Sequence, residues 1–329
     1  MSSVNTYLPP GEGETVFTVS STPIKFGVGA LRELGADAQG LGMTRVALFV
    51  DDHVLGTEAG ADALASLRAA GLDAVVYDHV RCEPDSDSFA AAAAFVREGA
   101  FDGFVSLGGG SVIDTAKAAN LLSTWPDDLL AYINAPIGRA KPIPGKLKPH
   151  IACPTTCGTG SETTGITIVD LKSVGLKTGI ASPLLKPTLA LIDPRTTESL
   201  PGGVVAATGF DVLTHAVESY TARPYTSRPK PAHPSQRPPY QGSTPYNDIG
   251  SLHAIRLGGR YLARAVRDAG DTEARHQLMF ASTLAGLAFG SAGVHIPHAM
   301  SYSVATLKHE FSDAGYADRD RMVPRGLAV

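Results

Sequence analysis

The first half of this 329-residue chain alternates short runs rich in β-branched and aromatic residues with alanine-rich runs. Thr44–Val50 and Asp73–Tyr77 are typical of buried strands, and Glu58–Ala70 between them is typical of a helix that ends at Gly71. Strands that alternate with helices at this spacing predict a parallel sheet covered by helices on both faces. Further helices are expected at Ser88–Glu98 and Val112–Leu122, and further strands at Phe104–Leu107, Ile151–Pro154 and Leu189–Ile192. A hairpin is expected from Ile166–Val169 and Lys177–Ala181.

The pattern changes near residue 195. Beyond this point apolar residues recur at helical spacing with no strand signal between them, in Val204–Tyr220, Asp248–Val266 and Thr272–Phe289. We therefore predict an α/β domain over residues 1–195 and an all-helical domain over residues 196–329. The first two helices are separated by a loop with seven prolines, and we expect no regular structure there because proline lacks the amide hydrogen.

Composition argues against several classes of protein. The net charge is −4 with no block of like charges, which argues against a nucleic-acid surface. No apolar run approaches the roughly 20 residues of a membrane helix, and Met1–Pro10 has neither the basic segment nor the apolar core of a secretory signal. Cys82, Cys153 and Cys157 are too few for a disulfide framework. We therefore expect a cytoplasmic protein without nucleic-acid or membrane partners.

A run of three glycines, Gly108, Gly109 and Gly110, follows a predicted strand and opens a predicted helix. Glycines let the backbone approach a ligand closely, and the helix N-terminus offers free amides and a partial positive charge. Ser111 and Asp114 match a capping pattern that would set the start of this helix. The arrangement favours pyrophosphate binding, and a tight strand-to-helix turn is the alternative.

Two further stretches are compatible with a bound nucleotide. Asp51 and Asp52 end the first predicted strand, where a carboxylate could bind the adenosine ribose and repel a 2′-phosphate; a solvated loop acid is the alternative. Pro154–Glu162 (PTTCGTGSE) follows another predicted strand. Its small hydroxyl side chains suit contact with the phosphates and nicotinamide of a cofactor, although on its own it could be any surface loop.

The predicted helix Val204–Tyr220 carries Asp211 and His215 four residues apart, which places a carboxylate and an imidazole on one face, as a first-row metal site needs. His298 follows the last predicted helix, with His295 three residues before it. The gathering of histidines and an acid favours a metal site, but helices also carry Asp/His pairs by chance. His295 alone fits a hydrogen-bonded structural histidine better.

Four segments resemble the iron-containing alcohol dehydrogenase family and occur in its order: Gly108–Lys117 (GGGSVIDTAK), Pro154–Thr163 (PTTCGTGSET), Lys186–Pro194 (KPTLALIDP) and Gly209–Tyr220 (GFDVLTHAVESY). Similarity to the hydroxyacid-oxoacid transhydrogenases within that family is found in Arg81–Asp85, Ala135–Lys141, Arg237–Asp248 and Gly293–Tyr302. The resemblance implies a Rossmann-like nucleotide-binding domain followed by a helical metal-binding domain, the dehydroquinate synthase-like architecture.

The resemblance also implies roles for single residues. Asp211, His215 and His298 match three of the family's four metal ligands, and we expect them to serve both metal binding and catalysis, with iron favoured over zinc. The expected cofactor is NAD. Its predicted binding residues are Asp52, Gly108, Gly109, Gly110, Ser111, Lys117, Thr155, Thr156, Thr159 and Lys177.

The fourth ligand position departs from the family's pattern. The family has a Pro-His-Gly motif, which here reads Pro324-Arg325-Gly326, and arginine stays protonated and cannot coordinate a cation. The chain ends at Val329, where relatives continue into further helices, so the second domain looks truncated. An inactive paralogue that only binds nucleotide is therefore one alternative for the function.

The resemblance implies, as the main expectation, hydride transfer from 4-hydroxybutyrate to 2-oxoglutarate through a nicotinamide that stays bound, assisted by a Lewis-acidic metal. Arg223, Arg228 or Arg237 could hold the substrate carboxylate, and a solvated cationic loop is the alternative. An NAD-dependent alcohol dehydrogenase that releases NADH is the other alternative function. We expect small hydroxy-acid and keto-acid substrates, and a homo-oligomer.

Overall fold

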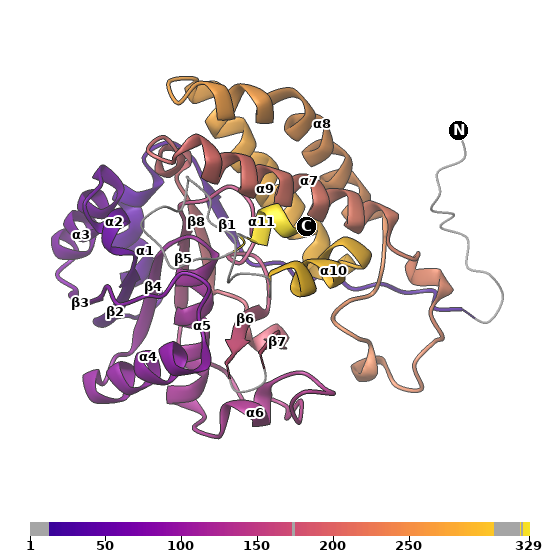
Figure 1. The fold of residues 1–329 in the computed structure, drawn as a ribbon. Helices are drawn as coiled ribbons and strands as arrows, with labels where there is room; N and C mark the ends of the chain where they lie inside the picture. Colours follow the sequence, from indigo (N-terminus) through magenta and orange to yellow (C-terminus); the bar gives the residue numbers. More distant parts are fainter. Residues whose placement is uncertain (1–12, 173–174, 306–322, 324) are drawn as a thin grey trace. The chain divides into compact units, whose positions relative to one another are not determined.

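The computed structural model describes residues 13–172, 175–305, 323 and 325–329 (Figure 1). The expectations for Met1–Pro10 and Pro324 concern residues outside this part of the chain. The chain divides into two compact units, each discontinuous in sequence. The sheet unit comprises Thr22–Thr156 and Ser161–Leu200, and the helical unit comprises Met1–Ser21, Cys157–Gly160 and Pro201–Val329. The division at residue 195 stays a prediction for the functional domains.

The sheet unit contains one parallel sheet with the strand order β1-β8-β5-β4-β2-β3, which confirms the predicted α/β class. Side chains alternate between its two faces, as the two-residue period of a strand requires. Val46, Leu48 and Val50 face one side, and Ala47 and Phe49 face the other. The strands are β1 (Ile24–Phe26), β2 (Arg45–Val50), β3 (Asp73–Tyr77), β4 (Gly103–Gly108), β5 (His150–Pro154) and β8 (Leu189–Ile192).

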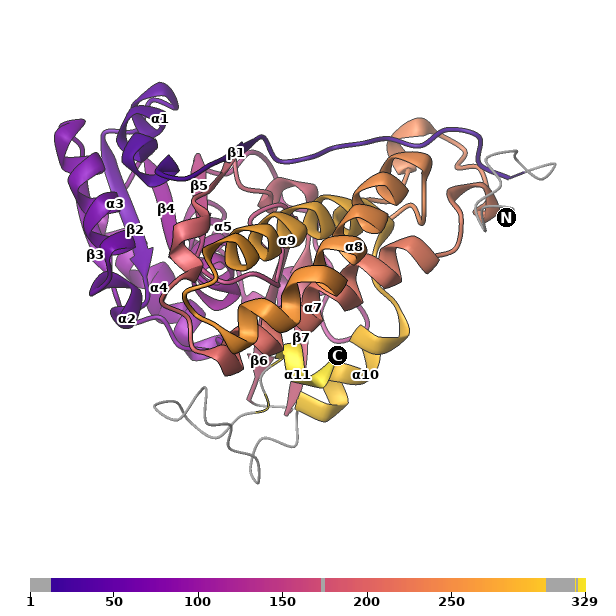
Figure 2. The same cartoon turned by 90° about the horizontal axis from the view of Figure 1, so that it is seen from above.

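Helices cover both faces of this sheet, as Figures 1 and 2 show. Residues of α1 and α3 pack in one apolar cluster with β2, and residues of α4 and α5 pack in the cluster on the opposite face. A separate antiparallel hairpin, β6 (Ile166–Leu171) with β7 (Leu176–Ala181), forms where the sequence predicted one. The helices of this unit are α1 (Leu34–Gly40), α2 (Asp52–Leu55), α3 (Glu58–Ala69), α4 (Ser86–Gly99), α5 (Gly110–Thr124) and α6 (Leu129–Tyr132).

The predicted capping pattern of α5 is wrong. The helix begins at Gly110, its N-cap is Gly109, and no side chain caps it. Ser111 already lies inside the helix, and its hydroxyl oxygen accepts a hydrogen bond from the amide of Glu83 at 3.1 Å. The amide of Val112 donates to the carbonyl of Gly109 at 3.0 Å, whereas the amides of Gly110 and Ser111 before it lie ahead of the first carbonyl that the helix could offer them.

The helical unit is built on three long helices, α7 (Gly202–Thr221), α8 (Pro245–Arg267) and α9 (Thr272–Ala292), all of them predicted. Small residues allow the helices to pack closely: a Cβ atom on Gly258 of α8 would lie 2.5 Å from Leu213 of α7. Two shorter helices follow, α10 (Ile296–Ala305) and α11 (Arg325–Ala328). One buried apolar cluster of this unit consists of Val212, Ala216, Ala254, Ala281 and Ala285.

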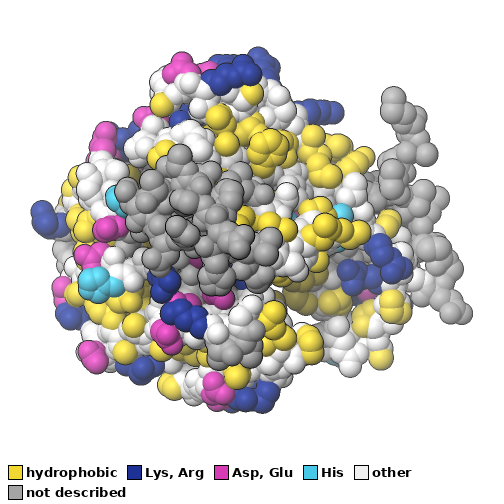
Figure 3. All heavy atoms as spheres, viewed as in Figure 1, with side chains coloured by type: hydrophobic (Ala, Val, Ile, Leu, Met, Phe, Trp, Pro, Cys, Tyr) yellow, Lys and Arg dark blue, Asp and Glu magenta, His cyan; other side chains and the backbone are white. Residues whose placement is uncertain are grey.

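The proline-rich loop between α7 and α8 contains two three-residue 3-10 turns, Tyr225–Ser227 and Pro234–Gln236, although no regular structure was expected there. Proline is compatible with the first position of such a turn, where the amide would have no partner. Among the described helices, none alone is long and apolar enough to cross a membrane; α9 and α10 together, bent by 104°, meet that test by length and composition. Acidic and basic side chains are interspersed on the face in Figure 3, in agreement with the small net charge.

Candidate functional site

A cluster of potential metal ligands lies in the helical unit. Asp211 and His215 come from α7 and His298 from α10, and one ligand atom of each lies within 4.8 Å of the others. His298 Nε2 is 3.4 Å from Asp211 Oδ1, and His215 Nδ1 is 3.6 Å from the same oxygen. All three residues are at least 98 % buried. The structure thus brings together the three residues that the sequence singled out, and places His298 within a helix rather than after one.

The imidazole of His215 has a defined orientation. Its Nδ1 donates to the carbonyl oxygen of Gly158 at 3.1 Å. Because a carbonyl oxygen only accepts, Nδ1 carries the proton in the neutral ring and the lone pair is on Nε2. The ring also stacks on the ring of Phe289, with centroids 4.0 Å apart, and on the ring of His298, with centroids 4.5 Å apart.

A fourth buried residue, Glu218, belongs to this cluster and was missed in the sequence. One of its carboxylate oxygens accepts from the amide of His295 at 2.7 Å, and the other accepts from Nδ1 of His298. Burial acts to raise the pKa of Glu218, but its hydrogen bond with His298, the charge of that ring and the backbone amides lower the pKa overall. The available signal was spacing: Glu218 follows Asp211 by seven residues, which is two helical turns on the same face.

The donor set of this cluster fits a divalent first-row metal. One carboxylate and two imidazoles are ligands that both iron and zinc accept, and three protein ligands with an open position are typical of catalytic sites. His295 hydrogen-bonds instead to the backbone oxygen of Glu218 and to Thr221, each at 3.1 Å, and 38 % of its side chain is exposed. This arrangement agrees with the structural role considered for His295.

The backbone that follows Arg325, the residue expected at the fourth ligand position, lies beside α7. Arg325 begins α11, and the next residue, Gly326, packs against the backbone of α7. A Cβ atom on Gly326 would lie 2.1 Å from the carbonyl oxygen of Ala207, so this close approach requires glycine. Ala207 is about one turn before Asp211, so the backbone of α11 runs next to the helix that carries two candidate ligands.

The candidate nucleotide residues of the sheet unit gather at the carboxyl ends of its strands. Gly109 follows β4, Asp52 follows β2, and Thr156 follows β5, so parallel strands bring all three to one edge. A Cβ atom on Gly109 would lie 3.1 Å from Thr156, which shows how closely these two loops approach. The amide of Thr155 donates to the carbonyl of Gly108 at 3.0 Å. Thr159, by contrast, belongs to the helical unit.

Asp52 lies in the first turn of α2 and is exposed, while the neighbouring Asp51 caps that helix by accepting from the amide of His53. The carboxylates of both acids accept from this amide, Asp51 Oδ1 at 2.9 Å and Asp52 Oδ1 at 3.0 Å, and Asp52 is the more exposed of the two. An exposed carboxylate at the end of an early strand can bind ribose hydroxyls.

The two lysines expected at the cofactor are held by other protein groups. Lys117 is buried, and its Nζ donates to the carbonyls of Ser161, Thr164 and Ile166 at 2.6–2.9 Å. Burial lowers the pKa of Lys117 to about 8, against the opposing charges of nearby acids. Lys117 therefore ties α5 to the end of the Pro154–Glu162 stretch and to the residues that follow it.

Lys177 on β7 forms an ion pair with Glu83, and the amide of Glu83 donates to Ser111. Glu83 thus connects two of the predicted cofactor residues. The sequence missed Glu83, because its two partners are 28 and 94 residues away along the chain.

Two of the three arginines considered for substrate binding have partners within the helical unit. Arg237 pairs with Glu14, with Nε 2.9 Å from Oε2, and this hydrogen bond holds the pKa of Glu14 below its usual value. Arg228 donates from Nε to the backbone oxygen of Gln241 at 2.8 Å. Arg237 therefore has a carboxylate of the protein itself as its partner.

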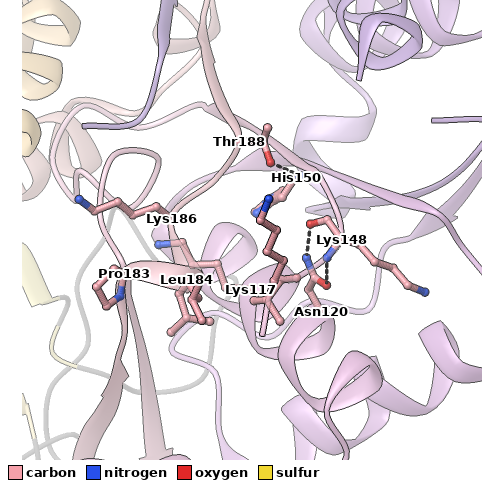
Figure 4. Close-up of a pocket in the computed structure, with 11 residues that line it drawn as sticks. Lys117, Asn120, Lys148, His150, Pro183, Leu184, Lys186 and Thr188 are labelled. Carbon is pink, nitrogen blue, oxygen red and sulfur yellow. Dashed lines mark hydrogen bonds between the residues drawn. The ribbon is translucent and has the colours of Figure 1, made fainter. Parts of the chain in front are cut away.

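A cavity of about 240 Å³ lies at the opposite edge of the sheet, beside His150 at the start of β5 and Thr188 before β8 (Figure 4). Four lysines are among its lining residues. Nζ of Lys148 donates to the carbonyl of Phe101, and the three donors of Lys117 are used as described above. The cavity thus offers a ligand fewer cationic donors than its lining suggests.

Solved structures of several dehydrogenases resemble this chain. A 1,3-propanediol oxidoreductase is 29% identical, with a TM-score of 0.79 over 92% of this chain and 73% of that one. The sulfoacetaldehyde reductase from Bifidobacterium kashiwanohense, solved in complex with NAD+, is 28% identical, with a TM-score of 0.78 over 95% of this chain and 74% of that one. These similarities confirm the predicted architecture.

Curated relatives are more similar still. The mitochondrial hydroxyacid-oxoacid transhydrogenase of Bos taurus is 49% identical and that of Homo sapiens 46% identical, each over 95% of this chain and 68% of the relative. The cytoplasmic location expected from the sequence is therefore wrong: these mitochondrial relatives point to the mitochondrion. Sparse cysteines showed only that no disulfides are needed, which does not distinguish one reducing compartment from another.

Two family models match the chain. Residues 21–194 match the model described as iron-containing alcohol dehydrogenase, and residues 240–309 match the C-terminal model of the same family. The first match alone covers more than half of the 329 residues. Together with the relatives above, it shows that this oxidoreductase belongs to the iron-containing alcohol dehydrogenase family.

Proposed function

We propose that this chain is a metal-dependent hydroxyacid-oxoacid transhydrogenase, which transfers a hydride from 4-hydroxybutyrate to 2-oxoglutarate through a bound NAD. The observation that carries the proposal is the 49% identity, over 95% of the chain, to an enzyme of that name. The buried cluster of Asp211, His215 and His298 supports it from the chemical side, because hydride removal from an alcohol needs a group that stabilises the developing alkoxide.

Asp211, His215 and His298 would hold the metal, for which the name of the family favours iron over zinc. A divalent cation bound there supplies Lewis-acid polarisation of the substrate hydroxyl. The protein's own contribution is orientation and exclusion of water. The carbonyl of Gly158 and the ring of Phe289 fix His215, and burial of all three ligands keeps the site dry.

For NAD we propose the edge of the sheet at the carboxyl ends of β2, β4 and β5. The amides of Gly110 and Ser111 at the start of α5 would face the pyrophosphate, with Gly108, Gly109 and Gly110 allowing the close approach. Asp52 would bind the adenosine ribose. Lys117 and Lys177 would act through the segments that they hold in place, and Ser111, Thr155, Thr156 and Thr159 complete the proposed cofactor residues.

An NAD-dependent alcohol dehydrogenase that releases NADH is the second candidate, and the similarity to 1,3-propanediol oxidoreductase favours it. The test is to incubate the purified protein with 4-hydroxybutyrate and 2-oxoglutarate without added NAD, and to follow both products by chromatography. A transhydrogenase forms the two products in equal amounts with no free NADH. NADH that accumulates from 4-hydroxybutyrate and added NAD, or a preference for uncharged butanol, would favour the second candidate.

Asp211→Asn serves as the control, because it removes the carboxylate charge with little change in volume and should abolish either activity. The expected homo-oligomer stays a prediction, which light scattering coupled to size-exclusion chromatography tests.

A further inference from the structure

Glu218 lies on the same face of α7 as two candidate ligands. Asp211, His215 and Glu218 are spaced by four and then three residues, so their side chains project from successive turns. Only 1 % of Glu218 is exposed. A buried carboxylate is costly unless charged or hydrogen-bonding partners compensate for the lost water, so its contacts should explain why it is there.

The first contact is with the start of α10. One oxygen of Glu218 accepts from the amide of His295 at 2.7 Å and more weakly from the amide of His298 at 3.4 Å. Helix α10 begins at Ile296, so these amides belong to the group at a helix N-terminus that has no partner within the helix. A carboxylate from α7 thus takes the place that a capping side chain of α10 itself would occupy, where negative charge is favoured.

The second contact is with the ring of His298. The other oxygen of Glu218 accepts from Nδ1 of His298. A carboxylate accepts only, so the neutral ring has its proton on Nδ1 and its lone pair on Nε2. His298 Nε2 lies 3.4 Å from Asp211 Oδ1, so the lone pair is on the side of the other candidate ligands. The Nδ1 proton of His215 has a neutral acceptor instead, the carbonyl of Gly158.

We propose that Glu218 is the positioning residue of this site: it caps α10, which carries His298, and it fixes the tautomer and orientation of the His298 ring so that Nε2 faces Asp211 and His215. The proposal rests on the proposed function in taking the cluster to be a metal site, but the capping and the tautomer are properties of the metal-free protein. The second ring nitrogen of a ligating histidine usually donates to an acceptor, and removing that acceptor lowers metal affinity or activity by about 10–100-fold.

The test compares Glu218→Gln and Glu218→Leu with the wild type, all stripped of metal. Two properties are measured: the ring tautomer of His298 by nitrogen-15 NMR of histidine-labelled protein, assigned with His298→Gln, and the affinity for Zn²⁺ by competition with a chelating dye. Glu273→Gln is the matched control, because Glu273 is a solvent-accessible glutamate in the first turn of α9.

We expect Glu218→Leu to lose the Nδ1-protonated form of His298 and to bind Zn²⁺ about 100-fold more weakly. Glu218→Gln keeps one acceptor oxygen, so it should retain that tautomer in part and lose about tenfold in affinity. The control should change neither property. If circular dichroism shows that Glu218→Leu does not fold, the proposal is tested by comparing the His298 tautomer and the Zn²⁺ affinity of Glu218→Gln with those of the control.

An unchanged tautomer and unchanged affinity in the variants would overturn the proposal. Because the tautomer is read in metal-free protein, this failure is distinct from a failure of the proposed function. A wild type that shows the expected tautomer but does not oxidise 4-hydroxybutyrate would contradict the transhydrogenase assignment and leave the role of Glu218 intact.

Discussion

The imidazole ring of His215 stacks on the phenyl ring of Phe289, with centroids 4.0 Å apart and planes inclined by only 7°. The ring of His298 stacks on His215 as well, at 4.5 Å. Two rings cannot share one face of an imidazole, so Phe289 and His298 hold His215 between them. An apolar side chain of α9 therefore contributes to the geometry of the candidate metal site.

We expect Phe289→Ala to destabilise the helical unit by about 3–5 kcal/mol, the usual cost of truncating a buried phenylalanine. It should also weaken metal binding, because His215 would gain rotational freedom. Urea unfolding and a Zn²⁺ titration measure the two effects. The control is Phe210→Ala on α7, whose side chain is 55% exposed and whose loss should change stability by no more than about 0.5 kcal/mol. Equal effects of the two substitutions would contradict the prediction.

The carboxylate of Asp52 should set the preference for NAD over NADP. Like charges about 4 Å apart repel by about 1 kcal/mol even in water. Asp52→Gly should therefore lower the ratio of the affinity for NADH to the affinity for NADPH about fivefold or more. Fluorescence titration with NADH and NADPH measures it. Asp51→Asn is the control, because asparagine can still cap α2 while the neighbouring charge is removed. A wild type that binds both cofactors equally well would show that Asp52 does not meet the ribose.

The buried His150 should make the sheet unit sensitive to acid. Burial, and then the charge of Lys117, lower the pKa of His150 to about 3 in the folded state, below its ordinary value of 6.5. Protonation therefore favours the unfolded chain: the stability from neutral His150 is complete above about pH 6.5 and falls by about 1.4 kcal/mol per pH unit as the pH drops toward 3.

The measurement is urea unfolding at pH 7, 6 and 5 of the wild type and of His150→Gln, which cannot titrate. The difference between the two slopes isolates His150. Burial raises the pKa of Glu162 to about 7, which makes its own contribution fall as the pH rises, but that contribution is common to both proteins. Parallel slopes would show that the ring is not held neutral.

Much of the fold could be predicted from the sequence because its elements have strong periodicity. The buried strands consist of β-branched and aromatic residues, and α7, α8 and α9 are long enough to show several turns of apolar spacing. Strand β1 was not predicted, since three residues are too few for a period and its place depends on pairing with β8, more than 160 residues later. Helix α10 was missed because its start is capped by Glu218 rather than by a residue of its own.

The residues of the candidate site also differ in whether the sequence alone could identify them. Asp211 and His215 could be identified because both lie on one face of one helix. Glu218 lies on that face too, but the spacing alone does not separate it from a solvent-facing glutamate, and the amide that it binds is 77 residues away. The same holds for Arg237, whose partner Glu14 is 223 residues away in sequence. Contacts of this kind leave no local pattern, and so the ion pairs and orienting bonds of the site appear only in the structure.

The last prediction concerns Arg325, which by the resemblance in sequence takes the place of the histidine of the Pro-His-Gly motif. The backbone next to it packs on α7 about one turn before Asp211, close to the helix that carries two candidate ligands. A guanidinium cannot coordinate a cation, and in the described part of the chain the cluster offers three candidate ligands, so we expect low metal content after purification.

Arg325→His should raise the affinity for metal by more than the roughly 10–100-fold that an indirect contact contributes, because it supplies a ligand and removes a positive charge. Arg325→Gln separates these two effects, since it removes the charge and adds no good ligand. Elemental analysis of iron and zinc in the three proteins, with Zn²⁺ affinities from chelator competition, measures the outcome. Equal gains for histidine and glutamine would mean that charge alone weakens the site. Near-stoichiometric metal in the unmodified chain would contradict the prediction, and would mean that Asp211, His215 and His298 hold the ion with an open fourth position, as catalytic zinc sites do.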